Sequence, residues 1–421
     1  QVPDEVTLMW CDDNYGYIRH FPTAEERARK GGNGVYYHVS YWGRPHDYLW
    51  LGTAHPSLVY QQMSLAYERG IQKMWILNVG DIKPAEYQVE LFLDMAWNLE
   101  EVKQQGIAAH QRHFLEREFG KNRADRLQPV MQEAYRLAYI RKPEFMGNTR
   151  TEEKDPKFKV ISDLPWCEQE INERLAAYRQ LSDKVEQEWH ALPAQKKETY
   201  FQLVKYPVQA AAQMNNKLLT AQLARHGKAD WADSDRAYDS IVSLTKTYNT
   251  TKWNRMMDFQ PRRLLVFNRV ERKALSSGLL EKPQAVYTWN GADCVEGASV
   301  ICEGLGYEGK AVAVEKKKEL TFEFAAWETD SVEVEVRLLP NHPVEGERLR
   351  FTISLDGSAT EAVSYETKGR SEEWKENVLC NQAVRRMILP VARKASHRLI
   401  FTALDEGVVL DQICLYMPRI K

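Results

Sequence analysis

This sequence has few cysteines, little net charge and no long apolar run, and each of these features excludes a class of protein. The six cysteines form no CxxC pair and no cluster with histidine, so a zinc site has no support. The formal net charge of -2 gives no electrostatic reason to expect binding to nucleic acid or to an anionic membrane. No apolar run approaches the roughly 18 residues of a membrane-spanning helix, and residues 1–5 lack the pattern of a signal peptide.

Motifs for nucleotides and for common hydrolytic centres are missing as well. No glycine-rich phosphate loop follows an apolar run, and no Walker lysine occurs, so we expect no nucleotide cofactor. There is no HExxH, and no G-x-S-x-G elbow supports a serine nucleophile. We therefore predict neither a cofactor nor a metal. Cys294 and Cys302 could bridge in an oxidising compartment, and the alternative is that the thiols are isolated and buried.

The length and the apolar content define what is present. A chain of 421 residues that is 43% hydrophobic can bury substantial cores, and it is long enough for two or three domains. Twelve tryptophans and twenty tyrosines make it rich in aromatic rings, which stack on sugar faces but more often pack in cores. Composition alone therefore does not identify a ligand.

The periodicity of apolar residues changes twice along the chain. In residues 1–100, short apolar runs at 6–10, 35–39 and 74–79 alternate with helical stretches at 24–30 and 57–69, which predicts parallel strands joined by helices. Residues 101–284 read as a helical bundle, and residues 285–421 as an antiparallel β-sandwich of alternating strands. The helices expected from residue 90 onward are 90–101, 107–119, 123–139, 168–191, 208–226 and 233–248, and the sandwich strands are 320–324, 332–336, 349–355, 398–401 and 408–413.

Each of the three parallel runs ends in polar residues. Asp12, Asp13 and Asn14 follow the first run, the second runs into His38 and Tyr41, and the third ends at Asn78. The carboxyl ends of parallel strands meet at one edge of a sheet, so three such ends indicate one shared site. If strand alternation continues to its end, Trp10, Asp12 and Asn14 share a face, where a carboxylate and an amide can hold a sugar hydroxyl or activate a water.

Each of these residues also has a purely structural interpretation. An aspartate in the first segment could instead cap a helix or bind a backbone amide, and His38 could be a satisfied core histidine. Arg44 suits an anionic group because its guanidinium matches a carboxylate, yet it could equally pair with Asp47. Asn78 can orient substrate or water, whereas Asp81 is expected to cap the following helix. Trp42 and Trp50 remain open between packing and sugar stacking.

Six long strings along the chain are distinctive: WCDDNYGYIR (10–19), YYHVSYWGRPHDYLW (36–50), NVGDIKPAE (78–86), WNRMMD (253–258), LLPNHPV (338–344) and LDEGVVLDQ (404–412). These strings closely resemble glycoside hydrolase family 115, whose members are xylan α-1,2-glucuronidases that remove (4-O-methyl)glucuronic acid with inversion. The similarity covers essentially the whole chain.

The resemblance implies the C-terminal part of an (α/β)8 barrel in residues 1–100, a helical domain, and a sandwich like a carbohydrate-binding module. It implies Asp12 and Asn14 as catalytic residues. It also implies that the uronic acid is bound by a second group of residues, namely Tyr15, His38, Tyr41, Arg44 and Asn78. Inversion requires an acid and a base separated by room for a water. One member of that pair, a glutamate, is expected shortly before the segment where this chain begins.

The partners and the setting follow from the same resemblance. We expect glucuronoxylan or its oligosaccharides as substrate, a missing N-terminal portion of the same protein, and a periplasmic or extracellular location. Half a parallel barrel leaves unpaired strand edges, so the chain is predicted to be a C-terminal fragment whose activity alone is doubtful. The alternative function is a non-catalytic polysaccharide-binding protein that uses the sandwich. Sugar binding and homodimer contacts both stay open as uses of that sandwich.

Overall fold

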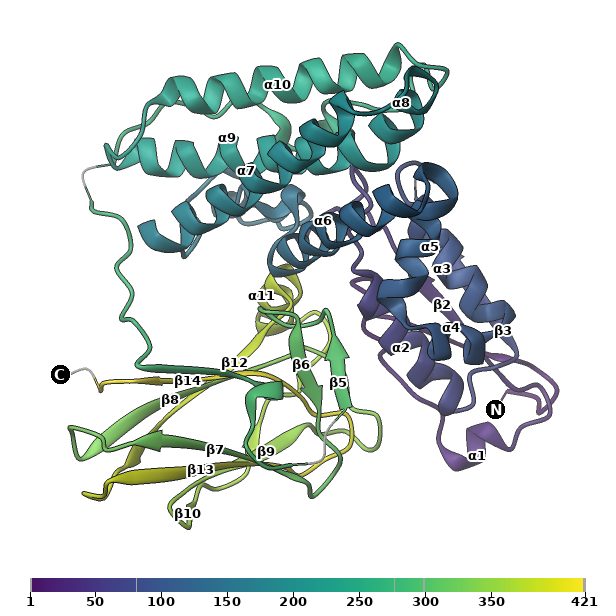
Figure 1. Cartoon of the computed structure of the whole chain (residues 1–421). Helices are drawn as coiled ribbons and strands as arrows, with labels where there is room; N and C mark the ends of the chain where they lie inside the picture. The colour runs from purple at the N-terminus through teal and green to yellow at the C-terminus, as the bar shows by residue number, and fades with distance from the viewer. Residues whose placement is uncertain (1, 81, 276, 298–299, 419–421) are drawn as a thin grey trace. The chain divides into compact units, whose positions relative to one another are not determined.

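A computed structural model describes residues 2–80, 82–275, 277–297 and 300–418, and its chain divides into two compact units (Figure 1). Unit 1 combines Gln1–His38, Ser57–Leu77 and Pro283–Lys421, so it joins the two ends of the sequence. Unit 2 combines Val39–Pro56 with Asn78–Lys282. The two units follow contacts in space, whereas the segments 1–100, 101–284 and 285–421 follow the apolar pattern along the chain. The bounds of those three segments stay a prediction.

The N-terminal part of unit 1 is built on a three-stranded sheet in the order β1-β2-β3. The strands are β1 (Leu8–Cys11), β2 (Asn33–His38) and β3 (Met74–Asn78), with helices α1 (Ala24–Arg27) and α2 (Pro56–Glu68) between them. β1 and β2 pair in parallel, as the strand–helix–strand order predicts. Thr23 starts α1 through a capping box with Glu26. The (α/β)8 barrel, of which these three strands would form a part, stays a prediction.

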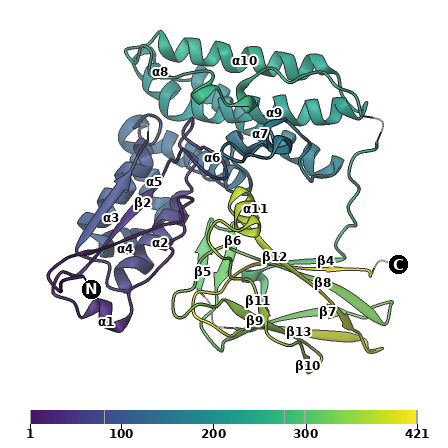
Figure 2. The same cartoon turned by 180° about the vertical axis from the view of Figure 1, so that it is seen from behind.

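The C-terminal part of unit 1 consists of two antiparallel sheets. One has the order β10-β9-β13-β7 with β11 beside β9, and the other has the order β12-β8-β14-β6-β5 with β4 beside β14. Figure 2 shows the two sheets as separate layers. The strands are β4 (Tyr287–Asn290), β5 (Val300–Glu303), β6 (Lys310–Ala313), β7 (Glu319–Ala325), β8 (Ser331–Leu338), β9 (Arg350–Leu355), β10 (Ser358–Ala359), β11 (Val363–Ser364), β12 (Ala383–Pro390), β13 (Ser396–Ala403) and β14 (Val409–Tyr416), and one helix, α11 (Glu372–Cys380), precedes β12.

The inward faces of both sheets share one hydrophobic core, and we call this part of the chain the two-sheet body. Phe322, Phe351 and Leu399 from one sheet and Val334 and Ile413 from the other are buried together. Their spacing of two along each strand is the alternation that predicted these strands. The alternation did not predict the strands β4, β5, β6, β10, β11 and β12, and it did not predict helix α11.

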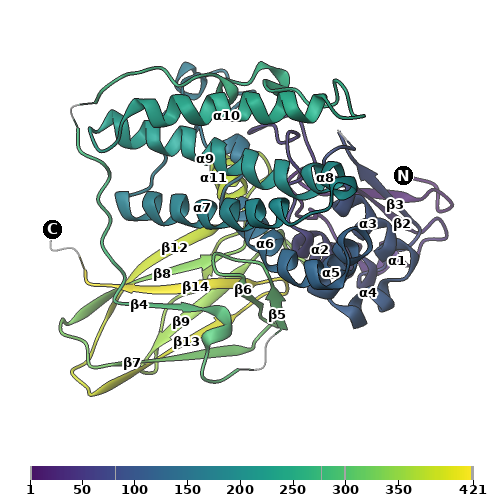
Figure 3. The ribbon, with the colours of Figure 1, turned by 45° about the horizontal axis from the view of Figure 1, so that its top comes forward.

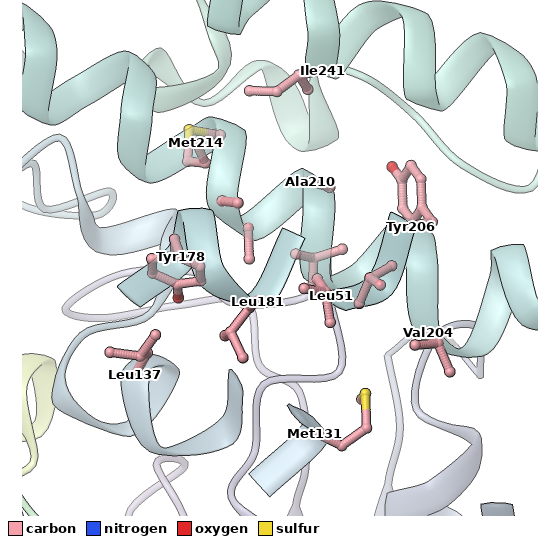
Figure 4. Packing of buried hydrophobic residues seen from close by; sticks show 14 of the residues in the cluster. Leu51, Met131, Leu137, Tyr178, Leu181, Val204, Tyr206, Ala210, Met214 and Ile241 are labelled. Carbon is pink, nitrogen blue, oxygen red and sulfur yellow. The ribbon is translucent and has the colours of Figure 1, made fainter. Parts of the chain in front are cut away.

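Unit 2 is helical, and most of its helices lie where the periodicity placed them. α9 is buried over most of its surface, and α10 packs along it (Figure 3). Figure 4 shows the core around α9, where Met214 and Ala210 lie among residues of neighbouring helices. The helices are α3 (Glu86–Trp97), α4 (Leu99–Gln105), α5 (Ile107–Phe119), α6 (Lys121–Ile140), α7 (Glu168–His190), α8 (Ala194–Tyr200), α9 (Tyr206–Arg225) and α10 (Trp231–Asn249), with a π-helical turn at Phe201–Lys205 and short 3-10 turns at Pro143–Phe145, Pro156–Lys159, Pro261–Arg263, Leu265–Phe267 and, in unit 1, Gly291–Asp293.

The cysteines and the apolar helices were the subject of two expectations from the sequence. All six cysteines are free, with Cys302 buried and Cys294 partly exposed, so no bridge forms between these two. Among the described residues, no helix is long and apolar enough to cross a membrane.

Lys217 on α9 is a buried charge that the helical core must accommodate. Its side chain is fully buried, and its Nζ donates to the carbonyl oxygens of Val266 (2.5 Å) and Asn268 (3.0 Å). Burial lowers the pKa of Lys217 to about 7. Two carbonyl acceptors do not replace the hydration of a full charge, so the neutral amine is favoured.

We expect the substitution Lys217→Met to change how stability depends on pH. Between pH 10 and pH 7 the unfolded chain binds a proton that folded Lys217 does not, so the wild type loses stability as the pH falls. Relative to the variant, that loss is up to about 1.4 kcal/mol per pH unit and stops below pH 7. Denaturant unfolding of both proteins across this range measures it. Lys246→Met, at an exposed position on α10, is the control. A wild type–variant difference that is the same at every pH would contradict the prediction.

Candidate active site

The candidate site in unit 1 is the loop that follows β1. The strand ends at Cys11, and Asp12 forms an isolated antiparallel bridge with Ile18. Asn14 has a φ of 74° and Gly16 a φ of 96°, so the chain turns back on itself between them. The alternation that was expected to align Trp10, Asp12 and Asn14 therefore does not reach Asn14, because a left-handed residue interrupts the extended backbone.

Asp12 and His38 form a buried pair across the ends of β1 and β2. The Nδ1 of His38 lies 2.6 Å from Oδ1 of Asp12, and both residues are buried. The other carboxylate oxygen accepts from the backbone N–H of Gly16 at 3.0 Å. Burial raises the pKa of Asp12, and the hydrogen bond and charge of His38 oppose that rise. An ionised Asp12 accepts from Nδ1–H and so sets the tautomer of His38.

Asp13 is buried beside Asp12 but has different partners. Its Oδ1 accepts from the backbone N–H groups of Tyr15 (2.9 Å) and Tyr17 (3.3 Å). Its Oδ2 lies 2.9 Å from Nε1 of Trp374 and 3.2 Å from Nε2 of His342. Asp13 therefore does not cap a helix; its carboxylate closes the loop and binds side chains from the two-sheet body.

The sequence did not single out His342 or Trp374. His342 lies in one of the strings that carry the family resemblance, where Asn and His follow an alternating strand, and that polar stretch was the available signal. Trp374 lies on α11, a helix that periodicity did not predict. Tyr15 is buried and meets the ring of Trp374 edge-on, with 5.8 Å between centroids. Packing thus accounts for Tyr15 in this structure, and its role at a substrate stays a prediction.

The remaining candidates belong to unit 2, where two segments meet. The N–H of Val39 donates to the carbonyl of Asn78 at 3.2 Å, and the N–H of Gly80 donates to Oγ of Ser40 at 2.6 Å. Tyr41 exchanges backbone hydrogen bonds with Tyr48 at 3.0 and 2.8 Å. The segments that carry Tyr41 and Asn78 are therefore neighbours, as expected. Asp81 lies outside the described residues.

Arg44 is exposed, and the alternative that it pairs with Asp47 is wrong. Asp47 is buried, and its carboxylate binds Arg262 at 2.6 Å. The guanidinium of Arg262 also lies over the ring of Trp42, at 4.0 Å from its centroid. Trp42 itself is 64% exposed. Asp47, which lies close to Arg44 in the sequence, is thus bound by the distant Arg262 instead.

Of the two alternatives for Trp50, packing and sugar stacking, the structure favours packing. It is buried, its ring meets Phe267 edge-on, and its Nε1 donates to the hydroxyl of Tyr206 at 3.1 Å. In the described part of the chain, no group of three or more histidine, cysteine or acidic side chains could hold a metal ion.

Comparison with known families gives the class of protein. The profile described as Glycosyl hydrolase family 115 matches residues 1–145, which contain β1 and the Asp12–His38 pair. The profile described as Glycosyl hydrolase family 115 C-terminal domain matches residues 298–421. Both matches assign the chain to the glycoside hydrolases.

A solved structure agrees with the profiles. It is described as a novel family GH115 4-O-methyl-α-glucuronidase, BtGH115A, with specificity for decorated arabinogalactans. Its sequence is 66% identical, the match covers 100% of this chain, and the TM-score is 0.98. The match covers 56% of that chain, so this chain spans little more than half of the relative's length. The chain belongs to glycoside hydrolase family 115, which confirms the resemblance.

Weaker likenesses involve carbohydrate-binding modules. One is the module from Cellvibrio mixtus lichenase 5A in complex with cellotriose, at 12% identity over 32% of this chain and 100% of that one, with a TM-score of 0.25. Another is a family 35 module from Clostridium thermocellum, at 10% identity over 31% of this chain and 98% of that one, with a TM-score of 0.25. Scores of this size carry no argument about fold or function. No curated protein matches the chain.

The loop should tolerate no side chain at Gly16. A Cβ there would lie 2.8 Å from Cδ2 of buried Leu58 and 3.1 Å from the hydroxyl of Tyr37, which donates to the Gly16 carbonyl. Gly357 has a similar φ of 90°, but its Cβ would meet nothing within 4 Å. Both Gly→Ala changes carry a backbone penalty of about 1–2 kcal/mol, and Gly16→Ala adds about 1–3 kcal/mol from overpacking.

Denaturant unfolding of the two glycine variants measures this difference, because the shared backbone penalty cancels between them. Equal destabilisation of Gly16→Ala and Gly357→Ala would show that the loop relaxes around a methyl group.

Proposed function

We propose that the full-length protein is an α-glucuronidase that removes (4-O-methyl)glucuronic acid branches from a decorated polysaccharide, with inversion. The observation that carries the proposal is the buried Asp12–His38 pair, 2.6 Å apart, in a chain 66% identical to a described 4-O-methyl-α-glucuronidase. Hydrolysis needs groups that hold and exchange protons beside the glycosidic bond, and a carboxyl with a raised pKa next to an imidazole is such a group. The family membership supplies the substrate class.

Within this proposal, Asp12 and His38 act as one proton-carrying unit. Both oxygens of Asp12 are engaged, by His38 and by the Gly16 amide, so its charge is held in one place. Asn14 supplies an amide for a sugar hydroxyl or for the attacking water. The uronate carboxylate and the sugar hydroxyls are assigned to Tyr15, His38, Tyr41, Arg44 and Asn78. Arg44 is exposed and suits an anionic group.

Two polysaccharides, glucuronoxylan and decorated arabinogalactan, are candidates for the backbone that carries the uronic acid branch. The family resemblance alone predicts glucuronoxylan, whereas the 66% identical relative is described as specific for decorated arabinogalactans. That relative favours arabinogalactan as the substrate of this protein. We also propose that the three-stranded sheet belongs to an (α/β)8 barrel and that the two-sheet body is a sandwich like a carbohydrate-binding module. A periplasmic or extracellular location and a homodimer stay predictions.

The alternative of a non-catalytic polysaccharide-binding protein has less support. Stacking on a sugar needs an exposed aromatic face. In the described residues of the two-sheet body, no tryptophan, tyrosine or phenylalanine is among the exposed large side chains. Instead Tyr287 stacks on Trp289, and both pack against Phe324 at the core. These rings contribute to stability and present no open platform.

The first test is release of 4-O-methylglucuronic acid by the full-length protein. Asp12→Asn should lower kcat at least about 100-fold, because the amide cannot exchange a proton with His38. Asn14→Ala should also lower kcat. The control is Asp411→Asn, at a buried aspartate of the two-sheet body whose partners are the Tyr307 N–H and the Gln382 amide. It should leave kcat within about twofold. Full activity of Asp12→Asn would remove Asp12 from the mechanism.

The second test compares two polysaccharides under the same conditions. We expect faster uronic acid release from a decorated arabinogalactan than from glucuronoxylan, as the description of the relative suggests. Faster release from glucuronoxylan would restore xylan as the substrate. Release from neither, with both polysaccharides shown to carry the branch, would contradict the proposed function.

A further inference from the structure

The loop that carries Asp12 and Asn14 is held from outside by helix α11 and by His342. Trp374, in the first turn of α11, donates its indole N–H to Asp13 at 2.9 Å. Asn381, the residue that caps the end of α11, accepts from the hydroxyl of Tyr17 at 2.9 Å. Both ends of α11 therefore bond to one loop of six residues, and Asp13 and Tyr17 are separated from α11 by more than 350 positions.

These contacts are buried and specific. Asp13, Tyr17, His342, Trp374 and Asn381 are all buried, so water does not compete for their hydrogen bonds. A buried carboxylate requires several donors. The loop supplies two backbone N–H groups to one oxygen of Asp13, and the two-sheet body supplies Trp374 and His342 to the other. Asp13 thus connects the loop to the two-sheet body through its carboxylate.

The helix is itself fixed in the orientation that these contacts need. Ser371 caps its N-terminus by accepting from the Trp374 N–H, and Asn381 ends it in the left-handed conformation with a φ of 51°. Glycine and asparagine favour that conformation at a helix end. Trp374 and Asn381 are therefore also held by contacts within and next to α11.

We propose that Asp13, held by Trp374 and His342, is a positioning residue that keeps Asp12 and Asn14 in their working geometry. The inference rests on the proposed function and gives α11 a part in the reaction. Asn14 adopts a φ of 74°, a conformation that costs free energy for a residue other than glycine and that the surroundings of the loop must therefore hold. A displacement of about 1 Å at a reacting group can lower the rate about 100-fold. Asp13 needs no contact with the substrate for this role.

The test uses two tryptophans of the two-sheet body in the full-length protein. Trp374→Phe removes the indole donor to Asp13 and keeps an aromatic ring. Trp327→Phe is the matched control, because Trp327 is also buried and its Nε1 donates to Thr329 and Ser331, away from the loop. We expect Trp374→Phe to lower kcat about 10- to 100-fold with KM changed less than about threefold. Trp327→Phe should keep kcat within about twofold at a similar loss of Tm.

A second variant tests Asp13 itself. Asp13→Asn turns one acceptor oxygen into a donor that must face either the loop amides or the indole N–H, so the loop should loosen. We expect a similar loss of kcat, because the geometry of Asp12 and Asn14 depends on the loop. The pH profile should also shift, because the substitution removes a charge that raises the pKa of Asp12. Unchanged kcat in Trp374→Phe and Asp13→Asn, with an active wild type, would overturn the inference.

Amide hydrogen exchange separates this inference from the proposed function. Exchange in residues 12–18 should become faster in Trp374→Phe than in Trp327→Phe, whatever the substrate is. A wild type that releases no uronic acid would contradict the proposed function alone, and the exchange measurement would still decide the positioning role. Equal exchange in both variants would overturn it.

Discussion

Two adjacent carboxylates are buried at the end of β1, and the surrounding structure must provide donors for both. Asp12 takes its donors from His38 and from the Gly16 amide, whereas Asp13 takes them from loop amides, Trp374 and His342. A buried carboxylate without donors would cost several kcal/mol. The parallel sheet and the two-sheet body of unit 1 therefore depend on each other at this point, although their sequences lie at opposite ends of the chain.

The two carboxylates differ in what their environments allow. Burial raises the pKa of Asp12, and the nearby charge of Asp13 adds to that rise, while its single imidazole partner counteracts it. Asp13 accepts two backbone N–H groups on Oδ1 and the indole N–H of Trp374 on Oδ2, so it has more neutral donors around it than Asp12 has. Asp12 is therefore paired with an imidazole at the end of the neighbouring strand, whereas Asp13 joins the loop to the two-sheet body.

Unit 2 uses buried charges in a similar way around the segment that follows β2. Glu144 accepts from the backbone N–H groups of Trp50 and Leu51, and Lys142 donates to the carbonyl of Thr53. Burial lowers the pKa of Lys142 and raises that of Glu144. With Arg262 bound to Asp47, three charged groups from distant positions fasten one irregular stretch of chain. Loops at strand ends cannot satisfy their own backbone groups, so they borrow partners from elsewhere.

The sequence by itself determined the local elements and the residues that gather at strand ends. Apolar periodicity predicted β1–β3, the long helices of unit 2 and five strands of the two-sheet body (β7, β8, β9, β13 and β14), because a buried face imposes a repeat on the chain. It also pointed to Asp12 and His38, and the motif strings pointed to the family. It missed α11, the role of Asp13 and the partner of Asp47. Those depend on contacts between residues more than 200 positions apart, and no local pattern encodes which distant donor a buried carboxylate receives. Only the tertiary structure decided that Arg262, Trp374 and His342 are those donors.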